Sequence, residues 1–286
     1  MKTTGLEIPM IGAQVFIEPG QTQQKIEHLF RTLQEHHMPL CRIRMFEKYM
    51  RTPYSGWDFS LFDLAFRTAE QYGVKIMATL FPMTDFTDVG GFKFPRTEEH
   101  FAEVQEYIRQ TVKHYRNFPA LFAWVLINEP GQVTLPDEPF SLRKFDEWKQ
   151  KQNSTDQNAA GYYHFPFDEE RFLLDYNTWY LNWIAEEIKA LDPERHLHVN
   201  NHAIFENAAE YDFPAWREFL DSFGGSAHAS WHFGYFDRSQ YTLGMAADCD
   251  IVRSGAGEKP WLMTEIQGGN NVYSGFDALC PTQEEI

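Results

Sequence analysis

The chain has 286 residues, enough for one large domain, with 43% hydrophobic residues and a formal net charge of −16 at pH 7. This charge argues against nucleic acid as a partner, because phosphate backbones are bound by clusters of Lys and Arg. It also argues against anionic membrane surfaces, and no apolar run approaches the ~18 residues that cross a bilayer. We therefore expect no nucleic-acid partner and no membrane partner.

The three cysteines, Cys41, Cys249 and Cys280, are too widely spaced to indicate a metal site or a disulfide framework. We expect Cys41 in a strand and Cys249 in a helix. Met1-Lys2-Thr3-Thr4 is not followed by an apolar stretch, so the sequence predicts no signal peptide. The compartment stays open, with a cytoplasmic or periplasmic bacterial enzyme as the expectation. Aromatic residues make up 16% of the chain, which fits either a well-filled core or a sugar-binding cleft lined with rings.

Strand and helix signals alternate along the whole chain. Apolar runs predict strands over 10–17, 40–46, 74–81, 122–130, 196–200, 227–233 and 260–265. Helical periodicity and capping signals predict two helices that are capped at their N-termini by Thr22 and by Ser60, and others over 97–115, 168–191, 214–222 and 240–253. The polar segment 132–167 interrupts this pattern and predicts an excursion that carries a short helix over 142–151.

Alternation of this kind implies a parallel sheet with right-handed crossovers, and we expect a (β/α)8 TIM barrel. A doubly wound open sheet is the alternative fold, but no GxGxxG or P-loop follows the first strand. The chain ends after the seventh predicted strand, so the barrel is expected to be truncated before its eighth strand. Residues 1–286 are accordingly expected to form one catalytic barrel domain whose C-terminal remainder is missing.

Two of the predicted strands end in a glutamate. Phe122–Asn128 runs into Glu129, and Pro260–Thr264 runs into Glu265. A charge at the end of a core strand costs several kcal/mol unless it is paired or used. Glycoside hydrolysis requires two carboxyl groups on either side of the bond, and barrel strands four and seven can hold them facing a common centre. The sequence therefore predicts Glu129 and Glu265 as the catalytic pair, with no metal ligand.

Polar residues at the same strand ends are candidates for substrate binding. Asn128 precedes Glu129 and is expected to contact a sugar hydroxyl next to the reacting carbon. Asn200, followed by Asn201 and His202, ends the predicted strand 196–200, and we expect one of the three to contact sugar.

Two further groups complete the predicted site. Arg42 and Arg44 lie two residues apart and therefore point the same way, where a guanidinium would hold the nucleophile ionised. Trp231, His232 and Tyr235 end the predicted strand 227–233, where they form either a bonding partner of the nucleophile or a packed aromatic corner.

Several motifs resemble one known family. Cys41-Arg-Ile-Arg44, Gly56-Trp-Asp-Phe59, Trp124-Val-Leu-Ile-Asn-Glu129, Ser230-Trp231 and Lys259-Pro-Trp-Leu-Met-Thr-Glu265 together resemble the family 42 β-galactosidase barrel of glycoside hydrolase clan A. The resemblance implies that Glu129 is the acid/base and Glu265 the nucleophile, with Arg42 and Asn128 as site residues. It also implies an aromatic ring after the nucleophile, for which Tyr273 is the candidate, a homotrimer formed by domains outside this sequence, and no cofactor.

The sequence thus predicts a retaining exo-β-glycosidase that acts on an oligosaccharide or glycoside, most similar to a β-galactosidase. Asn128-Glu129-Pro130 is commoner in the clan's mannan and glucan hydrolases, so a β-mannosidase or another β-glycosidase is an alternative. A catalytically inactive carbohydrate-binding barrel is a second alternative, although both acids are present. An aldolase-type or metal-dependent barrel enzyme is a third, but it needs a strand-end lysine or a His/Asp cluster, and neither Lys75 nor Lys93 fits.

Overall fold

The computed structural model describes residues 11–52, 56–82, 94–131, 134–152, 168–233, 236–268 and 282–285, apart from the side chains of Ser230 and Trp231. Its main sheet has seven strands in the order β1-β2-β5-β6-β7-β8-β9. Their bounds are Gly12–Val15 (β1), Leu40–Phe46 (β2), Lys75–Phe81 (β5), Leu121–Asn128 (β6), His196–Asn200 (β7), Ser222–Ala227 (β8) and Trp261–Ile266 (β9). A separate antiparallel pair joins β3 (Arg51–Thr52) to β4 (Gly56–Trp57).

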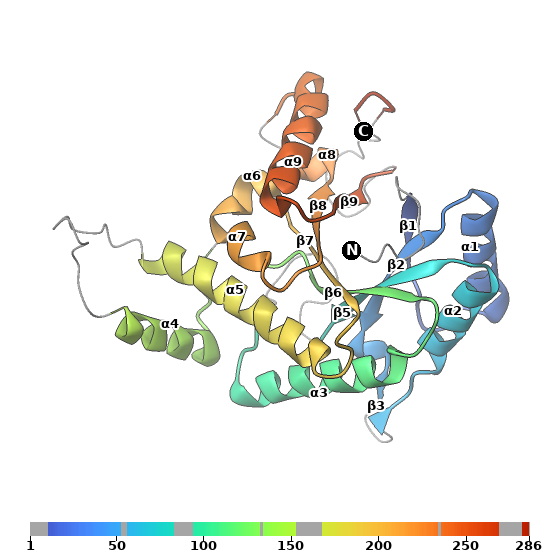
Figure 1. The fold of residues 1–286 in the computed structure, drawn as a ribbon, viewed down its shortest axis with the longest axis horizontal. Coiled ribbons are helices and arrows are strands. Elements are labelled where there is room, and N and C mark those ends of the chain that lie inside the picture. Colours follow the sequence, from blue (N-terminus) through green and yellow to red (C-terminus); the bar gives the residue numbers. More distant parts are fainter. Residues whose placement is uncertain are drawn as a thin grey trace. The chain divides into compact units, whose positions relative to one another are not determined.

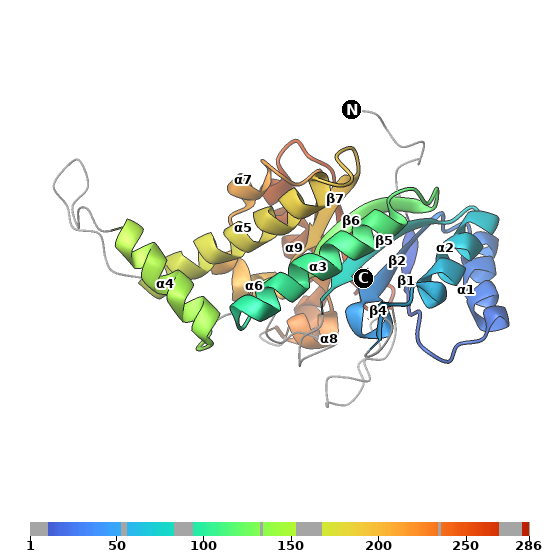
Figure 2. The same cartoon turned by 90° about the horizontal axis from the view of Figure 1, so that it is seen from below.

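Helices separate the strands of the main sheet (Figures 1 and 2). They are α1 (Gln23–Glu35), α2 (Ser60–Gln71), α3 (Glu98–Tyr115), α4 (Pro139–Lys151), α5 (Asp168–Lys189), α6 (Ile204–Asn207), α7 (Phe213–Trp216), α8 (Ala229–His232) and α9 (Tyr241–Ala256). Short 3-10 helices cover Glu47–Tyr49 (η1), Ala208–Glu210 (η2) and Arg238–Gln240 (η3). Within the described ranges, none of the helices combines the length and apolar character that crossing a bilayer requires. Parallel strands with helices between them match a (β/α)8 barrel of which seven strands are described.

The chain forms two compact units that are each assembled from separate segments. The first consists of Met1–Met83, Glu106–Asn128 and Ala185–Val199. The second consists of Thr84–Gln105, Glu129–Ile184 and Asn200–Ile286. Strand β6 lies in the first unit, and the second unit resumes at Glu129, directly after the last residue of that strand.

Three strands of the first unit, β2, β5 and β6, are buried along almost their whole length. Strands β1, β2 and β5 pair in parallel, with Gln14 opposite Arg42 and Arg42 opposite Met77. Helices α1 and α2 lie side by side next to these strands (Figure 1). Because helices cover such strands, they read as nearly continuous apolar runs in the sequence. Thr22 caps α1 by accepting a hydrogen bond from the Lys25 backbone N–H, as predicted.

The second unit contains β8 and β9 together with α9, which packs against β8. Strand β8 is unusual because it consists of small residues, Ser-Phe-Gly-Gly-Ser-Ala, and is buried throughout. Gly225 is required for close packing, since a Cβ there would lie 2.5 Å from Met263 Cε. Beyond β8, Phe233, Tyr241 and Met245 form an apolar cluster that includes Ala227.

Most predicted elements are confirmed, and β2 and β7 coincide with their predictions residue for residue. The predicted strand 227–233 is wrong: the strand ends at Ala227, and residues 229–232 form helix α8. The aromatic run that suggested a strand instead packs into the apolar cluster through Phe233. The predicted helix 214–222 is shorter, with α7 ending at Trp216 and Ser222 starting β8.

The expected cap of α2 is also wrong. Ser60 is the first residue of that helix rather than its cap. The side chain that accepts a hydrogen bond at this end belongs to Asp58, whose Oδ1 lies 2.9 Å from the Ser60 backbone nitrogen. The difference follows from position, because a carboxylate two residues before an N–H can fold back onto it.

Candidate active site

Glu129 stands at the point where the buried strand β6 gives way to a turn. Its side chain is buried, and its φ of 48° places a non-glycine residue in the left-handed region. Such a conformation costs of order 1–3 kcal/mol, and it is found most often at functional sites. Pro130 has no N–H with which to continue the strand ladder, and Gly131 follows with φ 107°. The backbone therefore turns sharply here and holds the carboxylate at the strand end.

Tyr211 holds the segments on either side of this turn. Its hydroxyl lies 3.1 Å from the Pro130 carbonyl oxygen and accepts a hydrogen bond of 3.0 Å from the His202 backbone N–H. Burial raises the pKa of Tyr211 well above its ordinary value, so the hydroxyl stays protonated at neutral pH. The Tyr211 hydroxyl thereby connects Pro130, the residue after Glu129, to His202, which follows β7.

Glu265 lies on β9, with its side chain largely buried. His228 Nε2 is 3.2 Å from Glu265 Oε2, and Asn200 Nδ2 is 3.5 Å from Glu265 Oε1. Asn200 is itself oriented by Ser226 on β8, whose Oγ accepts a hydrogen bond of 2.9 Å from the same amide nitrogen. Both carboxylate oxygens of Glu265 therefore have a partner, which fixes the plane of the carboxylate.

The two predicted catalytic acids lie close together within the second unit. One carboxylate oxygen of Glu129, one of Glu265 and a ring nitrogen of His228 all lie within 4.8 Å of one another. Retaining glycosidases separate their two carboxyl groups by ~5–5.5 Å, whereas inverting ones leave roughly 6.5–9.5 Å for a water molecule. Two carboxyl groups this close can flank one glycosidic bond.

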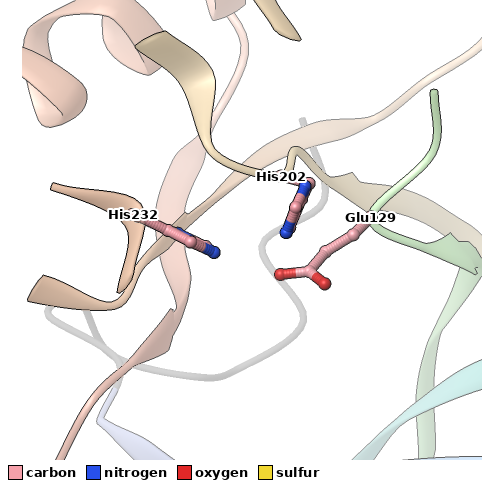
Figure 3. A group of neighbouring side chains, drawn as sticks. All are labelled: Glu129, His202 and His232. Carbon is pink, nitrogen blue, oxygen red and sulfur yellow. The ribbon is translucent and has the colours of Figure 1, made fainter. Parts of the chain in front are cut away.

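Two further histidines point toward Glu129 from other segments, as Figure 3 shows. A ring nitrogen of His202, a ring nitrogen of His232 and a carboxylate oxygen of Glu129 lie within 4.8 Å of one another. His232 Nδ1 is 2.8 Å from the Ser226 carbonyl oxygen, which can only accept, so Nδ1 carries the hydrogen. Burial, with a contribution from His228, lowers the pKa of His232 to about 4, so its ring is neutral at pH 7.

Arg42 and Asn128 contact each other in the first unit. Arg42 Nη2 donates to Asn128 Oδ1 at 2.6 Å, and Arg42 Nε donates to Thr79 Oγ1 at 2.8 Å. Both Arg42 and Asn128 are buried. The Arg44 guanidinium lies 5.4 Å from the ring centroid of Phe16. Of the two arginines, Arg42 is therefore the one that orients the asparagine before Glu129.

The remaining predicted residues are distributed as follows. His232 lies in helix α8 rather than at a strand end, because β8 ends earlier than predicted. Trp231 belongs to the same helix, and its side chain lies outside the described part of the chain. Tyr235 and Tyr273 also lie outside the described residues, so their roles stay predictions.

Sequence reasoning missed His228 and left His202 as one of three choices. His228 directly follows β8, a strand of small residues that lacks the branched and aromatic side chains by which strands are recognised. Among the three residues after Val199, Asn200 contacts Glu265, while Asn201 Oδ1 accepts from the Ser226 backbone N–H at 3.0 Å. A histidine one residue past a buried strand was the available signal.

The chain is similar to known glycosidases. No protein-family profile matches it. An 80-residue stretch is 40% identical to mannan endo-1,4-β-mannosidase A of Podospora anserina and covers 24% of this chain and 21% of that protein. The crystal structure of a β-galactosidase from the psychrophilic Marinomonas ef1 matches with a TM-score of 0.74 at 13% identity over 95% of this chain and 50% of its own. An endo-β-1,4-mannanase structure from Thermotoga petrophila matches with a TM-score of 0.67 at 17% identity over 94% and 63%.

This chain thus spans about half to two thirds of those solved structures' lengths. At such identities the likeness establishes the fold alone. The expected resemblance to the (β/α)8 barrels of clan A glycoside hydrolases is therefore confirmed at the level of the fold.

Proposed function

We propose that the protein is a retaining β-glycosidase in which Glu129 is the acid/base and Glu265 the nucleophile. The observation that carries this proposal is the approach of the two carboxylates within 4.8 Å, at the ends of β6 and on β9. The fold shared with β-galactosidase and mannanase structures supports it.

The reaction follows a double displacement. Glu265 attacks the anomeric carbon while protonated Glu129 delivers its proton to the leaving oxygen, which leaves a covalent glycosyl-enzyme. Glu129, now ionised, then takes a proton from water as the water attacks the same carbon and releases Glu265. Two inversions give net retention, and no cofactor takes part in either step.

The surroundings of Glu265 suit a nucleophile. Hydrogen bonds to the charged form of a carboxylate favour ionisation. Asn200 supplies an amide donor to one oxygen, and His228 faces the other. Because both partners come from β7 and the end of β8, the attacking oxygen is held in place before substrate arrives.

For the substrate we propose a terminal β-linked sugar, with β-galactoside as the first expectation. One observation favours a second candidate, a β-mannoside: the stretch that is 40% identical to a mannan endo-mannosidase. Nitrophenyl β-galactoside, β-mannoside, β-glucoside and β-fucoside would rank these sugars, and mannan with its oligosaccharides would distinguish chain-end from internal cleavage. Turnover of none of them by a folded protein would contradict the proposal.

The direct test replaces the proposed nucleophile. Glu265→Ala is expected to lower kcat by about 10⁴-fold or more, since the covalent step is lost. Added azide should restore turnover of an activated aryl glycoside by attacking the vacated space and forming a glycosyl azide of inverted configuration. Glu258→Ala, an exposed glutamate seven residues earlier, is the matched control and should retain wild-type kcat. Full activity of Glu265→Ala would refute the assignment.

A further inference from the structure

We propose that Glu129, His202 and His232 form a binding site for one divalent transition-metal ion, with Zn²⁺ as the probe, and that the bound ion switches the enzyme off. The binding part stands on the geometry of the three side chains. The inhibitory part rests on the proposed role of Glu129 as acid/base.

The three side chains converge from separate segments. Glu129 follows β6, His202 follows β7 and His232 lies in α8, and Figure 3 shows all three pointing into the same space. One donor atom of each lies within 4.8 Å of the others. Two ligands that are each ~2.0–2.2 Å from a zinc ion are at most ~4.4 Å apart, so small rotations of the side chains close the site.

The donor set selects the class of ion. Two imidazole nitrogens with one carboxylate oxygen are typical ligands of Zn²⁺ and of its neighbours Co²⁺, Ni²⁺ and Cu²⁺. Mg²⁺ and Ca²⁺ prefer sites built from oxygen atoms. Three protein ligands leave a further position for water. No spacing pattern in the sequence predicts this set, because its members are separated by 73 and 30 positions.

The surrounding hydrogen bonds orient both rings. The Ser226 carbonyl holds the hydrogen of His232 on Nδ1, so the lone pair of the ring is on Nε2, the atom through which it would bind a metal. His202 Nδ1 lies 3.2 Å from Asn207 Nδ2, and the same amide nitrogen lies 3.0 Å from the His202 carbonyl oxygen. Asn207 donates to Nδ1 in the metal-free protein, so ligation by His202 Nε2 moves the ring's hydrogen to Nδ1 and requires the Asn207 amide to flip and present Oδ1 to it.

Charge favours a cation at this place. The Glu129 carboxylate lies beside that of Glu265, and two carboxylates this close repel each other when both are ionised. A divalent ion bound to Glu129 offsets that repulsion. It also occupies the carboxylate oxygen that would deliver the proton, so the leaving oxygen receives none and the first chemical step stops.

The experiment measures binding directly. Calorimetric titration of the full chain with Zn²⁺ should give one tight site. His202→Ala, His232→Ala and Glu129→Gln should each weaken it by more than about tenfold, since loss of a second-shell group alone costs about 10–100-fold. His36→Ala, an exposed histidine after α1, is the matched control and should bind like the wild type. Thermal melts identify any variant that fails to fold, and Glu129→Gln, which conserves shape, carries the test in that case.

A second readout separates the two proposals. In an active protein, Zn²⁺ should abolish glycoside turnover with a midpoint equal to its calorimetric Kd, and EDTA should restore it. Affinity unchanged by Glu129→Gln and His232→Ala would overturn the site, and binding without inhibition would overturn the switch. A protein that binds Zn²⁺ through these residues but cleaves no glycoside would refute the proposed function while the metal site stands.

Discussion

Asp248 on α9 carries a carboxyl group that is buried in the folded protein. It is 1% exposed, and neither carboxylate oxygen has a hydrogen-bond partner among the residues that the structure describes. Burial raises the pKa of Asp248 to about 7, because the charged form is poorly solvated there. Between its ordinary pKa near 4 and this raised value, the folded protein keeps the proton that the unfolded chain has released. The contribution of Asp248 to the free energy of unfolding is therefore most favourable at low pH, and it falls progressively as the pH rises toward 7.

Asp248→Asn should remove this pH-dependent cost. We expect the variant to gain roughly 2–4 kcal/mol in free energy of unfolding over the wild type at pH 8, and much less at pH 4, because one pKa unit corresponds to about 1.4 kcal/mol. Urea unfolding at the two pH values measures the difference. Asp250→Asn, on the exposed face of the same helix, is the matched control and should change stability by under about 0.5 kcal/mol at either pH. An equal gain for Asp248→Asn at both pH values would contradict the argument.

At the scale of the elements, Arg195 joins three segments of the first unit just before β7. Its Nη1 donates to the Leu121 carbonyl at 2.7 Å, at the beginning of β6, and its Nη2 donates to the Arg116 carbonyl at 2.5 Å, after α3. Its Nε donates to Asp192 Oδ2 at 3.0 Å, an oxygen that also accepts from Trp124 Nε1. These contacts lie at the start of β6, whereas Glu129 follows its end, so Arg195 supports the fold and not the chemistry.

Arg195→Lys should therefore destabilise the protein without changing its catalytic rate. The single ammonium group of lysine cannot donate to all three acceptors that the Arg195 guanidinium reaches. We therefore expect a loss of about 2–3 kcal/mol in free energy of unfolding. Arg253→Lys, a mostly exposed arginine with a local ion pair, should cost under about 0.5 kcal/mol. Chemical denaturation together with kcat of the folded variants checks both expectations. A fall in kcat with unchanged stability would show that Arg195 acts on the site.

At the scale of the whole molecule, the two compact units share helices. Helix α3 passes from the second unit into the first after Gln105, and α5 does so after Ile184. Neither unit is a continuous piece of chain, so unfolding one breaks helices that belong to the other. The units therefore differ from the independent domains of a multidomain protein, each of which folds alone.

We expect a single cooperative unfolding transition for this reason. Far-UV circular dichroism, which reports helices and strands, and near-UV dichroism, which reports the packed aromatic rings, should give the same urea midpoint. Asp250→Asn, which changes the surface alone, serves as a reference for the scatter between the probes. Two separated midpoints would show that the units unfold independently.

The sequence by itself determined the alternation of strands and helices and the two strand-end acids. These features are local: a buried strand is an apolar run, and an acid at its end interrupts that run. For this reason the predicted bounds of β2 and β7 match the structure to the residue, and Glu129 and Glu265 stand out in the sequence as acids at the ends of apolar runs. The same local reasoning failed over 222–233, because the small residues of β8 carry little strand signal while the aromatic residues after it carry a misleading one.

Only the tertiary structure decided which side chains surround the two acids. His228 beside Glu265, and His202 with His232 beside Glu129, come from segments that are distant in the chain. No spacing rule connects them, since their distances depend on where each strand ends and on how the following turn directs the next residue. The left-handed backbone of Glu129 has the same origin: sequence alone favours glycine or asparagine in that conformation, and only the surrounding packing holds a glutamate there.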